Sequence, residues 1–282
     1  MKKLSLFIIA LVAFSCSKND SYTPPVNNSP TVDPKDLIVT TFLPTTNATW
    51  WKYNTTTTVI LPAPVAPATG VTTNLDQLNV HSDITVANIP YKLMKTTAAP
   101  TGFYSTMLND NKLRVDGSSI KLTGDVIFNL NNNPIALNVT DLTIFKENAV
   151  AGATLSTPQS GTKPFTPPGS SLNFNVNYIL TAKAENDLAS LTVGTTTYNN
   201  VKVVKLYVNA DVQFIAGPGS FIDALEPKTQ DVIVSTLYWV KNKGVVKAET
   251  ALNYKLASGL ASLGFPLEGR QNGVELLNST SF

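Results

Sequence analysis

The chain of 282 residues has little of what metal, disulfide and many catalytic sites need, because it contains one cysteine and one histidine. A disulfide framework requires paired cysteines, and a zinc site requires several Cys or His ligands. A histidine-dependent triad would have to use His81, and no Gly-x-Ser-x-Gly motif accompanies it. The sequence therefore predicts no metal, no cofactor and no catalytic residue. We expect His81 to be solvated, at the start of a strand.

Charge is also scarce, since only 14% of the residues are charged. Lys2 and Lys3 lie in a predicted signal peptide that is described below. Without them the 21 basic residues fall to 19, equal to the 19 acidic ones. Nucleic-acid binders need a strongly basic surface, so nucleic acid is excluded as a partner. A glycosidase-like hydrolase would need two carboxylates about 5–10 Å apart in a cleft. The acidic residues are scattered, mostly beside turn residues, and we expect a non-enzymatic protein with solvated acids.

The chain also lacks an apolar run long enough to span a membrane. Lys2 and Lys3 precede an apolar stretch at residues 4–14, which ends at Ser15 and Cys16. About eleven residues are too few for a bilayer core of ~30 Å, which needs roughly twenty. A positive start before a short apolar stretch is typical of a secretory signal. We expect a signal peptide at residues 1–15, cut before Cys16.

The residues around Cys16 resemble the lipobox of bacterial lipoproteins, although Ala13 and Phe14 depart from its strict form. The charged residues soon after it, Lys18 and Asp20, are similar to those of Bacteroidetes lipoproteins. The resemblance implies that Cys16 carries a lipid that anchors the chain in a membrane; the alternative is an ordinary signal peptide with an incidental cysteine. Residues 16–36 are rich in Pro, Asn and Ser, so we expect a disordered tether there.

Residues 37–282 are predicted to form a single all-β domain. Apolar and polar residues alternate in several stretches, most clearly at 204–214, as expected for strands with one buried face. Residues 232–240 and 246–254 form a predicted hairpin through Asn242-Lys243-Gly244. A second hairpin joins residues 188–193 to 201–214 through a turn at 198–200. Helical patterns are few, at 220–225 and 255–264, and the Pro-rich segments 61–73 and 156–171 are predicted loops.

Two short stretches resemble a family of secreted Bacteroidetes lipoproteins of uncharacterised function, with a fold similar to the LolA-like lipoprotein carriers. The first is Phe42-Leu43-Pro44 followed by Trp51-Lys52-Tyr53, with Thr45 and Ala48 departing from the family pattern. The second is Tyr238-Trp239-Val240 followed by Gly244-Val245-Val246-Lys247. The resemblance implies a strongly curved antiparallel sheet, a half-barrel, whose concave apolar face holds an acyl chain or another apolar ligand.

The leading hypothesis is a monomeric outer-membrane lipoprotein, facing the periplasm or the cell surface, that binds an apolar or amphipathic ligand in its concave sheet. The candidate ligand-binding residues are aromatic: Trp50, Trp51, Tyr53, Tyr238 and Trp239. Large aromatics on strands are more often core anchors, because each buries a large area. The rival is a module that binds a glycan or another protein through the Pro-rich loops and exposed aromatics such as Trp50 and Tyr104.

Overall fold

A computed structural model describes residues 40–60, 70–130, 133–166, 171–217, 220–259 and 268–282. These residues belong to one compact unit, which spans Asp33–Phe282. Cys16, the predicted signal peptide and the predicted tether lie outside the described residues.

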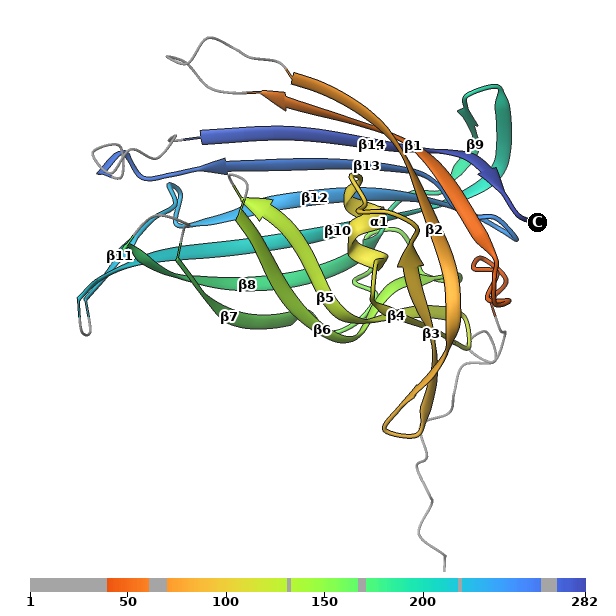
Figure 1. Cartoon of the computed structure of the whole chain (residues 1–282), viewed down its shortest axis with the longest axis horizontal. Helices are drawn as coiled ribbons and strands as arrows, with labels where there is room; N and C mark the ends of the chain where they lie inside the picture. The colour runs from red at the N-terminus through yellow and green to blue at the C-terminus, as the bar shows by residue number, and fades with distance from the viewer. Residues whose placement is uncertain (1–39, 61–69, 131–132, 167–170, 218–219, 260–267) are drawn as a thin grey trace, which may run out of the picture. The chain divides into compact units, whose positions relative to one another are not determined.

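The fold is an antiparallel sheet of fourteen strands, nearly closed into a barrel, and the described residues contain one short helix (Figure 1). The prediction of an all-β fold built on a large curved antiparallel sheet is confirmed. The helix is α1 (Phe103–Leu108), and the strands are β1 (Trp50–Ile60), β2 (Gly70–Val86), β3 (Ile89–Thr96), β4 (Lys112–Asp116), β5 (Ser119–Leu130), β6 (Asn133–Lys146), β7 (Gln159–Phe165), β8 (Asn173–Ala184), β9 (Leu188–Val193), β10 (Thr196–Gly217), β11 (Ser220–Asp223), β12 (Thr229–Val240), β13 (Gly244–Lys255) and β14 (Glu268–Thr280).

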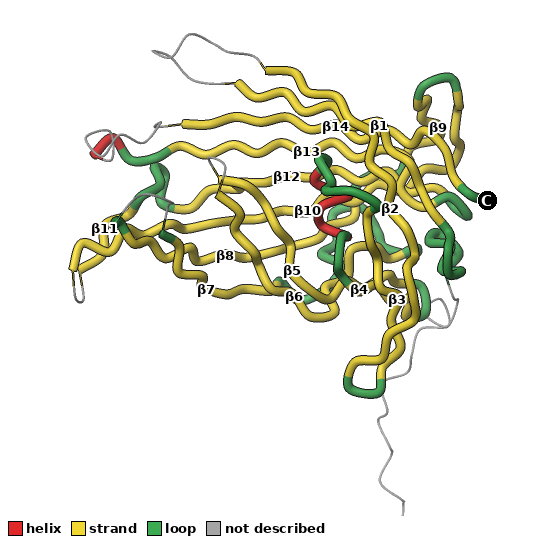
Figure 2. The backbone as a smooth tube through the Cα atoms, in the orientation of Figure 1, coloured by secondary structure: helices red, strands yellow, loops and turns green. Residues whose placement is uncertain are grey.

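The strand order is β6-β5-β4-β3-β2-β1-β14-β13-β12-β10-β8-β7, with β9 and β11 also paired to β10. Figure 2 shows how the sheet curls so that β6 and β7, the two ends of this order, approach each other. Side chains bridge this seam. The Gln159 amide accepts a hydrogen bond from the Thr140 N–H (2.8 Å) and donates one to the Thr140 carbonyl. The Tyr178 hydroxyl donates to the Asn138 carbonyl (3.3 Å).

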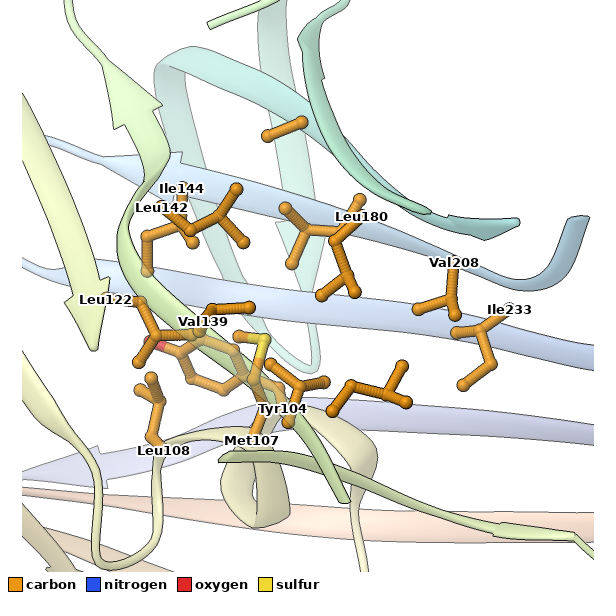
Figure 3. Close-up of a cluster of buried hydrophobic side chains, with 14 of the residues drawn as sticks. Tyr104, Met107, Leu108, Leu122, Val139, Leu142, Ile144, Leu180, Val208 and Ile233 are labelled. Atoms are coloured by element: carbon orange, nitrogen blue, oxygen red, sulfur yellow. The ribbon is translucent and has the colours of Figure 1, made fainter. Parts of the chain in front are cut away.

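The alternation of the sequence sets which residues face the interior. On β10 the even-numbered residues from Val204 to Val212 are buried, and the intervening residues are half-buried. On β1 Trp51 and Tyr53 are buried, whereas Trp50 and Lys52 are half-buried. This is the expected pattern for strands with one face in a core. Figure 3 shows a part of that core, where side chains of α1 meet residues of β5, β6, β8, β10 and β12.

The hairpin of β9 and the start of β10 forms a second, smaller core. Val193 and Val201 pack there against Val240 and Val246 of β12 and β13. The turn lies at Gly194 (φ 58°) and Thr195, so the prediction of a turn at residues 198–200 was wrong. Asn200 does have a positive φ (55°), but it lies within β10, between the paired residues Asn199 and Val201. Its tolerance of the left-handed conformation produces an irregularity in the strand.

Four other local predictions were wrong. Residues 220–223 form strand β11, paired with β10, and not a helical turn. Residues 159–165 of the predicted loop form β7, which accepts Pro164 because it is an edge strand. Gly70 to Thr73 of the other predicted loop begin β2, and residues 61–69 and 167–170 lie outside the described part. His81 is exposed as expected, but it lies within β2, at a register shift, and not at a strand start.

Candidate functional site

Helix α1 lies inside the barrel, on the connection between β3 and β4 (Figures 1 and 3). Tyr104, Met107 and Leu108 are buried and share one face of the helix, because residues three and four apart lie on the same side. Asn111 holds the segment after the helix: its side-chain N–H groups donate to the carbonyls of Met107 and Asp125, both at 2.7 Å. The helix is therefore fixed against the inner face of the sheet.

Two buried carboxylates hold the beginning of α1. Asp76 of β2 accepts hydrogen bonds from the N–H groups of Thr101 (2.9 Å) and Gly102 (2.8 Å) and from the Thr101 hydroxyl (3.1 Å). Glu275 of β14 accepts bonds from the N–H groups of Tyr104 and Ser105 and from the Ser105 hydroxyl (2.7 Å). The first N–H groups of a helix have no partner within it. Here two distant strands supply the acceptors, and Gly102 at the N-cap provides none.

Strand order explains why the two acids meet. Strands β2 and β14 lie on either side of β1, where Tyr53 pairs with Asp76 and Thr55 pairs with Glu275. Both carboxylates are buried, at 5% and 2% exposure. Burial, together with the charge of Asp76, raises the pKa of Glu275 to about 7, although the hydrogen bonds from Ser105 and Tyr104 act in the opposite direction. Burial also raises the pKa of Tyr53.

A cleft of about 60 Å³ lies beside α1 in the barrel interior. Its wall combines apolar residues with residues of another kind, most of them threonines. The apolar residues are Phe103, Ile127, Ile233 and Leu252, and the others are Thr57, Thr101, Thr106, Thr250, Gln271 and Gly273. Gly273 leaves space there: a Cβ on it would meet only the Thr250 carbonyl oxygen and Cβ, at 3.9 and 4.0 Å.

Residues 51–53 of β1 and residues 243–245 at the beginning of β13 lie together in the structure. The Trp51 indole N–H donates to the Lys243 carbonyl (2.7 Å), and the Tyr53 hydroxyl donates to the Val245 carbonyl (2.8 Å). Trp239 is fully buried and lies against Phe145, with ring centroids 4.9 Å apart. Three of the five candidate ligand-binding residues are therefore core residues: Trp51 and Tyr53 bind the C-terminal hairpin, and Trp239 packs against β6.

The other two candidates, Trp50 and Tyr238, are half-buried on the outer face. The Lys52 ammonium lies 5.0 Å from the centre of the Trp50 ring, and the Tyr238 hydroxyl donates to Glu249 (2.7 Å). None of the five lines the inner cleft. Tyr104, expected to be exposed, is fully buried on α1, so the rival glycan- or protein-binding hypothesis keeps only Trp50 of its two named aromatics.

A larger open groove of about 690 Å³ lies between residues 40–49 and the C-terminal Ser281 and Phe282. Its described lining contains no charged side chain, and most of it is threonine and other small residues. Thr40, the first described residue, is one of its walls. The inner cleft is therefore the better-defined candidate site, because described residues surround it on α1 and several strands.

Sequence reasoning missed both Asp76 and Glu275. A signal was present, because Asp76 has the same alternation phase as the buried residues Leu78 and Val80. Glu275 likewise lies on the face of β14 that carries Gly273. What the alternation could not show is that these two faces meet at one helix.

Comparisons with protein-family models, with curated proteins and with solved structures found no match. The structure thus defines the class of the protein by its fold: an all-β antiparallel sheet nearly closed into a barrel, with a short helix inside. In the described part of the chain, no three His, Cys, Asp or Glu side chains gather in a way that could hold a metal ion. Among the same residues no helix has the length and hydrophobicity needed to cross a bilayer.

Proposed function

We propose that this protein is a non-enzymatic lipoprotein that binds an apolar or amphipathic, lipid-like ligand in the interior of its barrel. The observation that carries the proposal is the cleft beside α1. Its threonine and glutamine residues suit the polar end of such a ligand, and Ile127, Ile233 and Leu252 suit its apolar part. A concave site that joins apolar side chains to polar ones matches the two ends of an amphipathic molecule.

The inner face beyond the cleft is also apolar. Phe165, Phe174 and Phe214, on β7, β8 and β10, form a chain of ring contacts with centroids 6.3 and 5.5 Å apart. They belong to the same core as Ile233, which lines the cleft. An acyl chain that extended from the cleft along this face would therefore meet apolar side chains.

We further propose that the chain is anchored through a lipid on Cys16 in the outer membrane, on the periplasmic or the outer side, and acts as a monomer. The support is the sequence around Cys16 and the resemblance to LolA-like lipoproteins, whose implied curved sheet agrees with the architecture described above. Growth of the bacterial host with an alkyne-tagged fatty acid tests the anchor. The full chain should carry the tag and sediment with membranes, and Cys16→Ala should do neither; a tagged or membrane-bound Cys16→Ala would refute the anchor.

Native mass spectrometry with lipid extraction tests the ligand, on the chain from residue 17 onward produced without its lipid. We expect a bound lipid-like mass in the original sequence. Gly273→Leu should reduce its occupancy at least tenfold, because the new side chain fills the cleft from a position without backbone strain. The matched control is Gly70→Leu, at an exposed site where a Cβ meets nothing within 4 Å. Equal occupancy in the two variants would exclude the cleft as the binding site.

A further inference from the structure

The two carboxylates at α1 lie in a setting that disfavours two negative charges. Both approach the Thr101-Gly102 backbone, and a Cβ on Gly102 would overlap the Glu275 side chain. The described residues form ion pairs elsewhere on the barrel, but none of those pairs includes Asp76 or Glu275. Two buried carboxylates without a cation cannot both ionise cheaply, so one of them tends to hold a proton.

Glu275 is the one whose surroundings accept that proton. The groups that face it are Asp76 from β2, Tyr53 from β1, Tyr104 from α1 and the uncharged Ala248 from β13. A protonated Oε2 would donate to the Ser105 hydroxyl over the same 2.7 Å that the Ser105 hydroxyl now spans as donor. Oε1 would still accept the bond from the Tyr104 N–H. With Glu275 neutral, both carboxyl oxygens therefore keep their contacts with Tyr104 and Ser105.

The segment that carries α1 lies between two strands, and hydrogen bonds to Asp76, Glu275 and Asn111 hold it against the sheet. Strand β3 ends at Thr96 and β4 begins at Lys112, so the residues between them belong to no strand. Two of these residues, Phe103 and Thr106, form part of the cleft wall. The cleft holds about 60 Å³, well below the roughly 300–1,000 Å³ of sites that hold drug-sized ligands. A lipid-like ligand therefore requires the cleft to widen, and the segment of α1 is the one part of its described wall that belongs to no strand.

We propose that α1 is a proton-linked plug, which closes the inner cleft while Glu275 is protonated and is released when Glu275 ionises into water. The entry of a ligand past the plug rests on the proposed function. The coupling between the position of α1 and the protonation of Glu275 is independent of that function. The pKa of Glu275, raised by burial to about 7 in the closed position, returns towards the ordinary value of 4.5 when the side chain is solvated. Opening therefore releases a proton between these two values.

The sign and size of the effect follow from this linkage. Below about pH 4.5 both positions of α1 carry a protonated Glu275, and opening does not depend on pH. Between about pH 5 and 7 the equilibrium constant for opening should rise by up to about tenfold per pH unit, since one proton is released. Above about pH 7 the constant should level off. Alkaline conditions open the plug and acidic conditions close it.

Hydrogen–deuterium exchange followed by mass spectrometry tests the plug on the chain from residue 17 onward, between pH 5 and 8. Rates for the peptide covering residues 97–111 are divided by the intrinsic exchange rates at each pH, and peptides of β12 serve as the reference for global unfolding. We expect α1 to be at least tenfold less protected than β12, and its protection to fall about fortyfold from pH 5 to 7, as a pKa change between about 7 and 4.5 requires. Equal protection of α1 and β12, or α1 protection independent of pH, would overturn the proposal.

Glu275→Gln isolates the proton. This variant keeps the shape of the side chain and cannot ionise, so α1 should stay protected at every pH. Glu249→Gln is the matched control on the outer face of the neighbouring strand β13, where Tyr238 and Lys247 contact the carboxylate. It should keep the full pH dependence. A pH dependence that persists in Glu275→Gln would place the proton elsewhere and refute the proposal.

If Glu275→Gln does not fold, the original sequence and Asp76→Asn remain decisive. Removal of the Asp76 charge should move the midpoint of the α1 transition to lower pH, since that charge helps to raise the pKa of Glu275. An unchanged or higher midpoint would contradict the proposed pair. If native mass spectrometry finds no ligand but the α1 transition is intact, the proposed function alone is refuted. If a ligand is bound but α1 shows no pH-dependent transition, the plug alone is refuted.

Discussion

Tyr53→Phe provides a sharp test of whether the buried aromatics of β1 stabilise the fold or bind a ligand. The change removes one hydroxyl, whose hydrogen bond to the Val245 carbonyl (2.8 Å) is buried and joins β1 to β13. The ring itself, with its edge contact to Tyr104 at 5.7 Å, remains. A buried hydrogen bond contributes about 1 kcal/mol net, and a carbonyl left without a partner costs about 1–3 kcal/mol. We expect a loss of about 2 kcal/mol in the free energy of unfolding.

Urea unfolding monitored by tryptophan fluorescence measures this loss, with Tyr238→Phe as the matched control. The Tyr238 hydroxyl donates to the half-exposed Glu249, so water can replace it and the loss should stay below about 1 kcal/mol. If Tyr53→Phe lowers the free energy of unfolding by no more than Tyr238→Phe does, the stabilising role of the hydrogen bond between Tyr53 and Val245 is refuted. An unchanged stability with reduced ligand occupancy would instead favour the predicted ligand-binding role of Tyr53.

Two further predictions concern α1. The free energy of unfolding should decrease as the pH rises from 5 to 8, because the pKa of Glu275 is about 7 in the folded chain and an ordinary 4.5 in the unfolded chain. The stability that the bound proton contributes is complete below pH 4.5 and is lost as the pH rises through 7. At about 1.4 kcal/mol per pKa unit the decrease is about 3 kcal/mol, and Glu275→Gln should abolish it in urea titrations. Asn111→Ala should cost about 2–3 kcal/mol in the same assay, since it leaves the Met107 and Asp125 carbonyls unpaired; a loss below about 1 kcal/mol would contradict this.

The strands that sequence reasoning located best are those with uninterrupted alternation. Residues 204–214 and the hairpin of β12 and β13 were predicted correctly, because one buried face imposes a period of two. The turn of that hairpin was also readable, since Asn242 and Gly244 adopt positive φ values of 60° and 82°. Prediction failed where the same residue type is compatible with two structures. Asparagine tolerates a positive φ both in turns and in strands, and Asn200 adopts it inside β10 rather than at the turn.

Helix α1 was missed because its pattern is only six residues long. Tyr104, Met107 and Leu108 show helical spacing, but so few residues do not distinguish a helix from a strand or a loop. An isolated helix of this length is also unstable in water, so its formation depends on packing. The barrel supplies that packing, together with the Asp76 and Glu275 acceptors that no residue near α1 in the sequence provides.

The sequence by itself determined the strand faces and the main hairpin, since each depends on residues within a few positions of one another. Tertiary structure alone decided that β2 and β14 flank β1, that the sheet nearly closes, and that two acids meet at a buried helix. Strand neighbours far apart in the chain are selected by the packing of the whole sheet, which leaves no local pattern. The candidate site depends on those pairings, and for that reason it became visible only in the folded chain.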